Sequence, residues 1–172
     1  MNKAERGELI DRYLDGPAQL RAALEEAPET MRKWQPEPGE FSVHEIIVHC
    51  ADSETNSHGR IRYLVNEKNA TIIGYDPGEW AKTFDYLNHP IEPALLTVEA
   101  VRANTVPILL KLSDAQWAKS GTHTESGPYS VEDWLTIYAA HCHDHADQIR
   151  NVIGAWEDAG SRTPNAVAPA PG

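Results

Sequence analysis

Apolar residues recur at helical spacing along almost the whole chain. The first predicted helix spans residues 4–26, where acids and arginines separate the apolar positions and leave them on one side. Gly16-Pro17 lies inside this segment, and we expect it to bend or interrupt the helix because proline lacks a backbone donor. The apolar side of this helix comprises Leu9, Tyr13, Leu20 and Leu24.

A second helix is predicted to begin after Ser42 and to end at residues 64–67. Ser42 and Glu45 are three residues apart, which is the pattern of a capping box that closes the first turn. The connection that follows contains Gly, Pro and Asn over residues 69–78 and a short helical segment over 79–87. Connections of this length are uncommon in small domains and often carry functional elements.

A third long helix is predicted to begin at residues 90–93 and to end near Lys111. Pro107 lies within it and should kink it, because the proline ring crowds the preceding turn. Residues 113–129 are expected to form a loop, since Gly and Pro interrupt them. One side of the third helix carries Leu95, Val98, Arg102, Val106 and Leu109.

The last helix is predicted to start at Ser130, which can form a reciprocal cap with Asp133, and to run to about Trp156. The tail of residues 159–172 is rich in Ala and Pro and is expected to be disordered. No segment shows the alternating pattern of a strand. Four amphipathic helices therefore predict an all-α fold, a four-helix bundle of residues 1–158 with a short extra helix.

Composition and charge exclude several classes of function. The chain has 172 residues with 41% hydrophobic content, which is enough for one domain with its own core. A formal charge of -11 and scattered Lys and Arg residues provide no basic stripe, which argues against nucleic-acid binding. The first residues lack the apolar stretch of a signal peptide, and no run is long enough to cross a bilayer. We therefore expect a cytoplasmic protein that is not bound to a membrane.

The last helix carries the most informative residues, in the run Ala140-His-Cys-His-Asp-His-Ala-Asp-Gln-Ile149. His141 and His145 are four residues apart, so both imidazoles project from one face of the helix and can bind one metal ion. A pair of core histidines that are satisfied by hydrogen bonds is the alternative interpretation. The same face is predicted to be buried, because it also carries Trp134, Ile137, Tyr138, Ile149 and Val152.

His49 is the best candidate for a third metal ligand. It lies in the second predicted helix, in an apolar segment about one turn after Ile46. Three neutral imidazoles that leave a coordination position open are typical of catalytic transition-metal sites rather than of closed structural ones. Imidazole donors favour zinc or nickel, and manganese and iron are further candidates. No catalytic residue other than the ligands is identified.

Ligand histidines usually donate their other ring N–H to a carboxylate, a carbonyl or an amide. Glu45 and Asp52 lie four residues before and three residues after His49, and Gln148 lies three residues after His145. At this spacing side chains are neighbours on a helix. We therefore predict that Gln148, Asp52 and Glu45 hold the ligand imidazoles, the alternative being a solvated face.

Three neighbours of the candidate ligands should point elsewhere. Cys50 and Cys142 each follow a candidate ligand, and one residue along a helix rotates a side chain by about 100°. Both are expected to be reduced thiols and small core residues beside the site. His143 lies two residues from both histidines of the last helix, so it should point to the opposite side, toward solvent or another subunit.

Three motifs resemble those of the DinB-like (damage-inducible, YfiT-like) family of metalloproteins. The similarity covers roughly residues 5–157. The motifs are Ile-Val-His-Cys-Ala-Asp-Ser-Glu around His49, Leu-Ser-Asp-Ala-Gln-Trp at residues 112–117, and His141-x3-His145-x2-Gln148-Ile149. This resemblance implies a four-helix bundle whose middle connection crosses over, a divalent metal held by three histidines, and frequently a homodimer. By position, the ligands implied are His49, His141 and His145.

The resemblance also limits the functions to be considered. Family members include low-molecular-weight thiol S-transferases, a mycothiol-dependent isomerase and proteins labelled metal-dependent hydrolases. We therefore expect a metal-dependent enzyme, a thiol S-transferase or a hydrolase, that acts on a small-molecule substrate such as a low-molecular-weight thiol. The alternative is a non-catalytic, stress-linked metal-binding bundle. The large residues Trp80, Phe84 and Tyr86 exceed what a small core readily absorbs, and with the resemblance they predict a homodimer.

Overall fold

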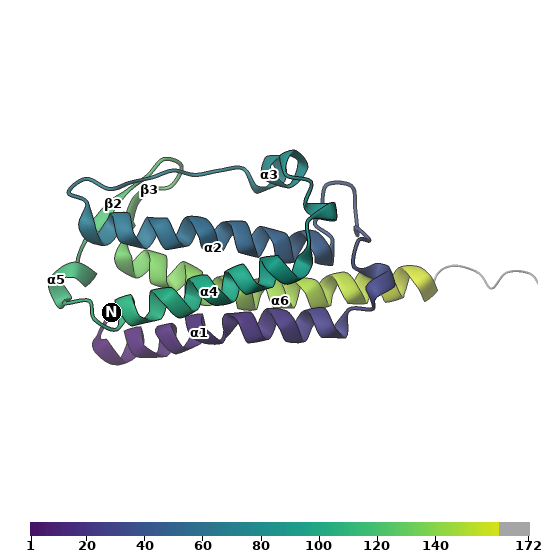
Figure 1. Cartoon of the computed structure of the whole chain (residues 1–172), viewed down its shortest axis with the longest axis horizontal. Coiled ribbons are helices and arrows are strands. Elements are labelled where there is room, and N and C mark those ends of the chain that lie inside the picture. Colours follow the sequence, from purple (N-terminus) through teal and green to yellow (C-terminus); the bar gives the residue numbers. More distant parts are fainter. Residues whose placement is uncertain (162–172) are drawn as a thin grey trace, which may run out of the picture.

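The computed structural model describes residues 1–161 of the chain. Four long helices pack into the predicted all-α bundle (Figure 1). They are α1 (Lys3–Glu26), α2 (Val43–Asn66), α4 (Ile91–Leu109) and α6 (Val131–Ser161). α1 contacts α4 and α6, and α2 contacts the same two helices, so α1 and α2 lie at opposite corners of the bundle. α1 and α6 run in one direction, and α2 and α4 run in the other.

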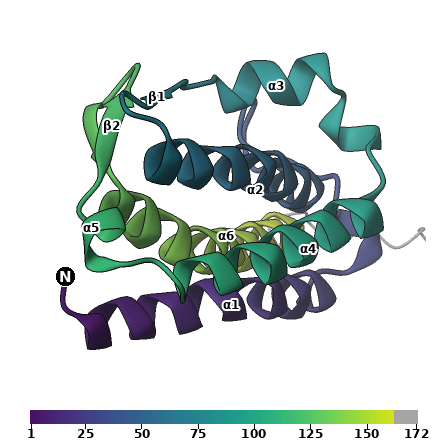
Figure 2. The same ribbon diagram turned by 60° about the vertical axis from the view of Figure 1, so that its left-hand side comes forward.

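The connection from α2 to α4 crosses the length of the bundle, as the resemblance implied (Figure 2). Two parallel helices need such a crossover because the chain must return to the end at which the first helix began. The connection contains β1 (Thr71–Ile72), α3 (Pro77–Thr83) and the 3-10 turn η2 (Tyr86–Asn88). α5 (Asp114–Trp117) precedes the strands of the next connection.

The aromatic residues of the crossover are more buried than the sequence suggested. Tyr86 is almost fully buried, and Trp80 stacks on Tyr75 with ring centroids 4.3 Å apart. Phe84 is the one large exposed residue of the three named for dimerisation. The apolar surplus that favoured a dimer is therefore smaller than predicted.

The prediction that the chain has no strand is wrong. β1, β2 (Ser120–His123) and β3 (Gly127–Ser130) form a sheet at one end of the bundle, with β1 parallel and β3 antiparallel to β2. Strands of two to four residues are too short to show alternation in the sequence. Gly121 permits the close approach of β1, since a Cβ there would lie 2.4 Å from the carbonyl oxygen of Ala70.

Two of the long helices begin at the caps that the sequence predicted. The backbone N–H of Ser42 donates to the Glu45 carboxylate at 2.9 Å, and the Ser42 hydroxyl accepts from the Glu45 N–H at 3.3 Å. Ser130 and Asp133 make the same exchange at 2.8 and 3.0 Å. Local hydrogen bonds of this kind depend only on residues three apart, so the sequence is sufficient to locate them.

The last helix is longer than expected. α6 continues to Ser161, beyond the predicted end at Trp156, and includes residues 159–161 of the predicted tail. The remainder of that tail, residues 162–172, lies outside the described residues. Ile137, which was predicted to lie on the buried face of α6, is 47% exposed. The other apolar residues predicted for that face, Trp134, Tyr138, Ile149 and Val152, are buried. No helix among the described residues combines the length and the apolar character that a membrane span requires.

A polar layer divides the apolar core of the bundle into two halves. Arg102 of α4 and Glu54 of α2 form a fully buried ion pair in this layer. Gly16 makes room for it, because a Cβ there would lie 2.2 Å from a guanidinium nitrogen of Arg102. α1 continues through Gly16-Pro17 without the interruption considered above. One half of the core includes Leu20, Val98 and Ile149. The other half includes Ile61, Leu109 and Trp134.

Candidate metal centre

Three histidine side chains from two helices meet between α2 and α6. His49 projects from α2, whereas His141 and His145 project from α6. One nitrogen of each ring lies within 4.8 Å of a nitrogen of the others. The ring centroids are 5.5 Å apart for His49 and His141, 4.9 Å for His49 and His145, and 4.5 Å for His141 and His145. The structure thus brings together the three residues that the sequence singled out.

Two buried nitrogen atoms of this cluster lack a hydrogen-bond partner. Within residues 1–161, Nδ1 of His49 and Nδ1 of His141 are buried and unpaired. A buried polar atom without a partner costs about 1–3 kcal/mol, so a core pair satisfied by hydrogen bonds does not explain the arrangement. A divalent transition-metal ion would satisfy these atoms, and the set of three imidazoles fits one.

The buried surroundings keep the three imidazoles neutral. Burial lowers the pKa of His49 to about 4, with a smaller contribution from the neighbouring His145. Burial also lowers the pKa of His141 and that of His145 below their usual value. A neutral imidazole has a free lone pair at physiological pH, which is the form that a metal ion binds.

We expect the metal-free protein to lose stability as the pH falls from 7 to 5. The unfolded chain takes up protons on these histidines near their ordinary pKa of about 6.5, whereas the folded chain does so only at lower pH. The free energy of unfolding should therefore decrease through this window, by at least about 1 kcal/mol. Urea unfolding at pH 7, 6 and 5 measures it. A His49→Gln variant should show a shallower decrease, and a constant value in the unmodified protein would contradict the expectation.

Two side chains hold the histidine rings of α6. Oε1 of Gln148 accepts from Nδ1 of His145 at 2.8 Å, as predicted from their spacing. The Ser53 hydroxyl lies 3.3 Å from Nε2 of His141. Ser53 was not among the residues predicted for the site, although it lies four residues after His49 and so on the same face of α2. With these contacts in place, Nε2 of His145 and Nδ1 of His141 are left for an ion.

The predictions that Glu45 and Asp52 hold His49 are wrong. Glu45 accepts from Ser42 in the capping box and from Nε2 of Gln35 at 2.9 Å. Asp52 accepts from the Tyr86 hydroxyl at 2.5 Å. The crossover brings Tyr86 next to α2. This contact joins residues far apart in the chain, so the spacing of residues along α2 cannot predict it.

The neighbouring cysteines lie beside the histidines, as predicted. Cys50 and Cys142 are free thiols in the buried core. Cys142, Glu54 and His141 also have candidate ligand atoms within 4.8 Å of one another. Both carboxylate oxygens of Glu54 already accept hydrogen bonds, one from Arg102 and the other from the Tyr13 hydroxyl. This second group is therefore a poorer metal site than the three histidines.

His143 points away from the cluster, as its spacing predicted. Its Nε2 lies 3.0 Å from the carbonyl oxygen of Arg12, and its side chain is 21% exposed. The ring therefore packs against α1 and is only partly accessible to solvent. Tyr138 is a core residue, and its hydroxyl accepts a hydrogen bond from Arg60 at 3.0 Å.

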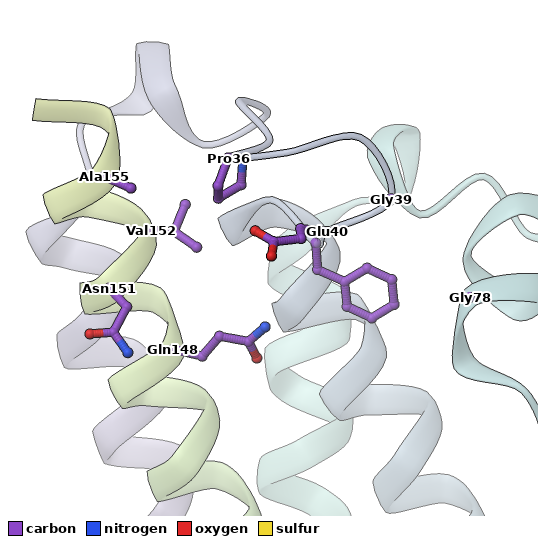
Figure 3. A pocket seen from close by; sticks show the side chains of 9 residues that line it. Pro36, Gly39, Glu40, Gly78, Gln148, Asn151, Val152 and Ala155 are labelled. Atoms are coloured by element: carbon purple, nitrogen blue, oxygen red, sulfur yellow. The ribbon is translucent and has the colours of Figure 1, made fainter. Parts of the chain in front are cut away.

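A cavity of about 550 Å³ lies between α6 and the segment before α2 (Figure 3). Two of its lining residues contact the histidines: Gln148 binds His145, and the Phe41 ring centroid lies 5.7 Å from that of His49. A space of this size can hold a small-molecule ligand. The sequence did not reveal the cavity because its walls come from segments far apart in the chain. The lining residues are Pro36, Gly39, Glu40, Phe41, Gly78, Gln148, Asn151, Val152 and Ala155.

The chain is similar to proteins described by one class of activity. A sequence profile of the DinB superfamily matches residues 12–149. An Oceanobacillus iheyensis protein named "Putative metal-dependent hydrolase" is 35% identical over 114 residues, which cover 66% of this chain and 66% of that protein. A Bacillus mycoides protein of the same description is 27% identical over 149 residues, covering 84% of this chain and 86% of the relative.

One solved structure shares the fold. YfiT from Bacillus subtilis superposes with a TM-score of 0.84 at 22% sequence identity, and the match covers 91% of this chain and 90% of YfiT. It is described as "a probable metal-dependent hydrolase with an unusual four-helix bundle topology". At this level of identity the likeness shows a common fold.

Proposed function

Because the chain belongs to the DinB superfamily, we propose that it is a metal-dependent hydrolase whose divalent ion is held by His49, His141 and His145. The observation that carries this proposal is the pair of buried, unpaired Nδ1 atoms of His49 and His141. Two relatives whose names include metal-dependent hydrolase support the same class of reaction. Three imidazole donors favour zinc or nickel over manganese or iron.

The chain's own residues prepare the site in three ways. Gln148 and Ser53 each contact one ring nitrogen, of His145 and His141 respectively, which restricts the rings and leaves the other nitrogen of each free for an ion. The Phe41 ring packs beside that of His49, which is buried, and this burial limits the access of water. The cavity beside them admits a substrate. When bound, a divalent ion supplies Lewis acidity, which activates water and polarises a substrate carbonyl near neutral pH.

We expect hydrolysis of simple esters or amides by the metal-loaded protein and none by the chelator-treated protein. The rate should rise with pH and level off above about 7, as expected for water activated by an ion with three histidine ligands. A panel of esters, amides and low-molecular-weight thiol acceptors measures this. Thiol transfer without hydrolysis would favour the S-transferase activity that the resemblance implied. Bound metal without turnover of any substrate would favour the non-catalytic alternative.

A further inference from the structure

We propose that the cavity beside the histidines binds an uncharged carboxamide, through the amides of Gln148 and Asn151 on one wall and the Glu40 carboxylate on the other. This inference rests on the proposed function and names the substrate class of that hydrolase. It excludes carboxylates and phosphates as the group that enters this cavity.

The contact with His145 fixes the orientation of the Gln148 amide. A histidine that binds a metal through Nε2 carries its proton on Nδ1, so the atom that faces Nδ1 of His145 must be an acceptor. Oε1 of Gln148 takes this position at 2.8 Å. The NH2 group must then lie at the other end of the amide, and Figure 3 shows the amide nitrogen directed into the cavity. His145 is the one hydrogen-bond partner of the Gln148 side chain within residues 1–161.

Asn151 places a second amide on the same wall. It follows Gln148 by three residues on α6, so the two side chains are neighbours on one face of the helix. Both line the cavity, and Figure 3 shows both side chains on its side of α6. Each NH2 group is a donor from which the carbonyl oxygen of a ligand can accept.

Glu40 supplies the acceptor on the opposite wall. It lies in the connection between α1 and α2, and Figure 3 shows its carboxylate extending into the space in front of Gln148. A carboxylate accepts hydrogen bonds and cannot donate them, so it matches the N–H groups of an amide. Donors on one wall and an acceptor on the other are complementary to the two ends of a carboxamide.

The charge of the cavity decides between an amide and an anion. Glu40 is the only ionisable residue among the nine that line it, and no Lys, Arg or His is present there. A carboxylate or phosphate would meet a like charge at Glu40, and no cation lines the cavity to compensate it. An ammonium group would be attracted by Glu40 but could not accept from Gln148 and Asn151. The apolar chain of a ligand can lie against Phe41, Val152 and Ala155.

Three probes of equal chain length test the proposal: hexanamide, hexanoate and hexylamine. Nuclear magnetic resonance titration of the ¹⁵N-labelled, metal-free protein gives each Kd and follows the side-chain NH2 signals of Gln148 and Asn151. We expect hexanamide to bind at least about fivefold more tightly than the other two, the effect of about one net hydrogen bond, and to shift both signals. Equal or tighter binding of hexanoate or hexylamine would overturn the proposal.

A Gln148→Glu variant separates the two roles of this residue. Its carboxylate can still accept from Nδ1 of His145, so metal binding measured by elemental analysis should persist, while the NH2 donor is lost. Hexanamide should bind about fivefold to tenfold more weakly. Asn104→Asp introduces the same charge at an exposed position on α4 and should leave the Kd unchanged. Unchanged affinity in Gln148→Glu would show that the cavity does not bind amides in this way.

The proposed hydrolase activity and the proposed binding of amides can fail independently of each other. If the protein takes up no metal and hydrolyses nothing, the proposed function fails, whereas selective binding of hexanamide can still be observed. If it is a metal-dependent hydrolase of charged substrates and hexanamide binds no better than hexanoate, the inference about the cavity fails alone.

Discussion

Replacing His145 with Ala is expected to abolish stoichiometric metal binding and to lower the melting temperature of the metal-loaded protein. His145 and His141 come from α6 and His49 from α2, so the ion would link two helices of the bundle. An ion that binds only the folded state stabilises it by mass action, by about 4 kcal/mol when its concentration is a thousand times its Kd. Elemental analysis after dialysis and thermal unfolding with and without a chelator measure both effects.

His143→Ala is the matched control for this experiment. It changes the same residue type on the same helix, but its ring faces the carbonyl oxygen of Arg12 on α1. This variant should retain one equivalent of metal. With chelator present, His145→Ala and the unmodified protein should melt at similar temperatures, because the difference between them comes from the ion. Retention of metal by His145→Ala together with its loss in His143→Ala would reverse the assignment of the two faces of α6.

Replacing Arg102 with Met is expected to lower the free energy of unfolding by about 3–5 kcal/mol. The guanidinium is fully buried and donates to Oε1 of Glu54 at 3.0 Å from Nε and 2.5 Å from Nη2. It also donates to the carbonyl oxygens of Tyr13 at 2.5 Å and Tyr138 at 3.0 Å. Its removal leaves a buried carboxylate without a counter-ion and the Tyr13 carbonyl without a donor, because Pro17, four residues later in α1, has no N–H. Urea unfolding of the metal-free protein measures the loss.

Two further variants show whether the buried charge is responsible. The double variant Glu54→Gln/Arg102→Met has no uncompensated charge, so it should be less destabilised than Arg102→Met alone. Arg150→Met removes the surface pair with Glu26, whose side chains are 37% and 49% exposed, and should cost less than about 1 kcal/mol. Equal losses in Arg102→Met and Arg150→Met would show that the polar layer contributes no more than the surface.

The ion pair between Arg102 and Glu54 lies close to the candidate metal centre. Glu54 follows His49 by five residues on α2, and the thiol of Cys142, next to His141, lies 4.0 Å from its carboxylate. Arg102 therefore joins α4, α1, α2 and α6 at the level of the histidines. The sequence placed Arg102 on the apolar side of its helix but gave no indication of its partner, because that partner lies on another helix.

The sequence by itself determined the features that depend on neighbouring residues. Helical periodicity located the four long helices, and the caps at Ser42 and Ser130 follow from residues three apart. The same periodicity placed His141 and His145 on one face, Gln148 within reach of His145, and His143 on the opposite side. These relations are fixed by the geometry of one helix, so no knowledge of the fold is needed to infer them.

Only the tertiary structure decided which groups meet across helices and connections. It brought the Tyr86 hydroxyl within hydrogen-bonding distance of Asp52, paired Arg102 with Glu54, and placed Ser53 beside His141. It also formed the three short strands and the cavity between Glu40 and Gln148. The physical reason is that these contacts join segments far apart in the chain. Their partners are selected by the packing of the bundle, and a pattern of local periodicity carries no information about it.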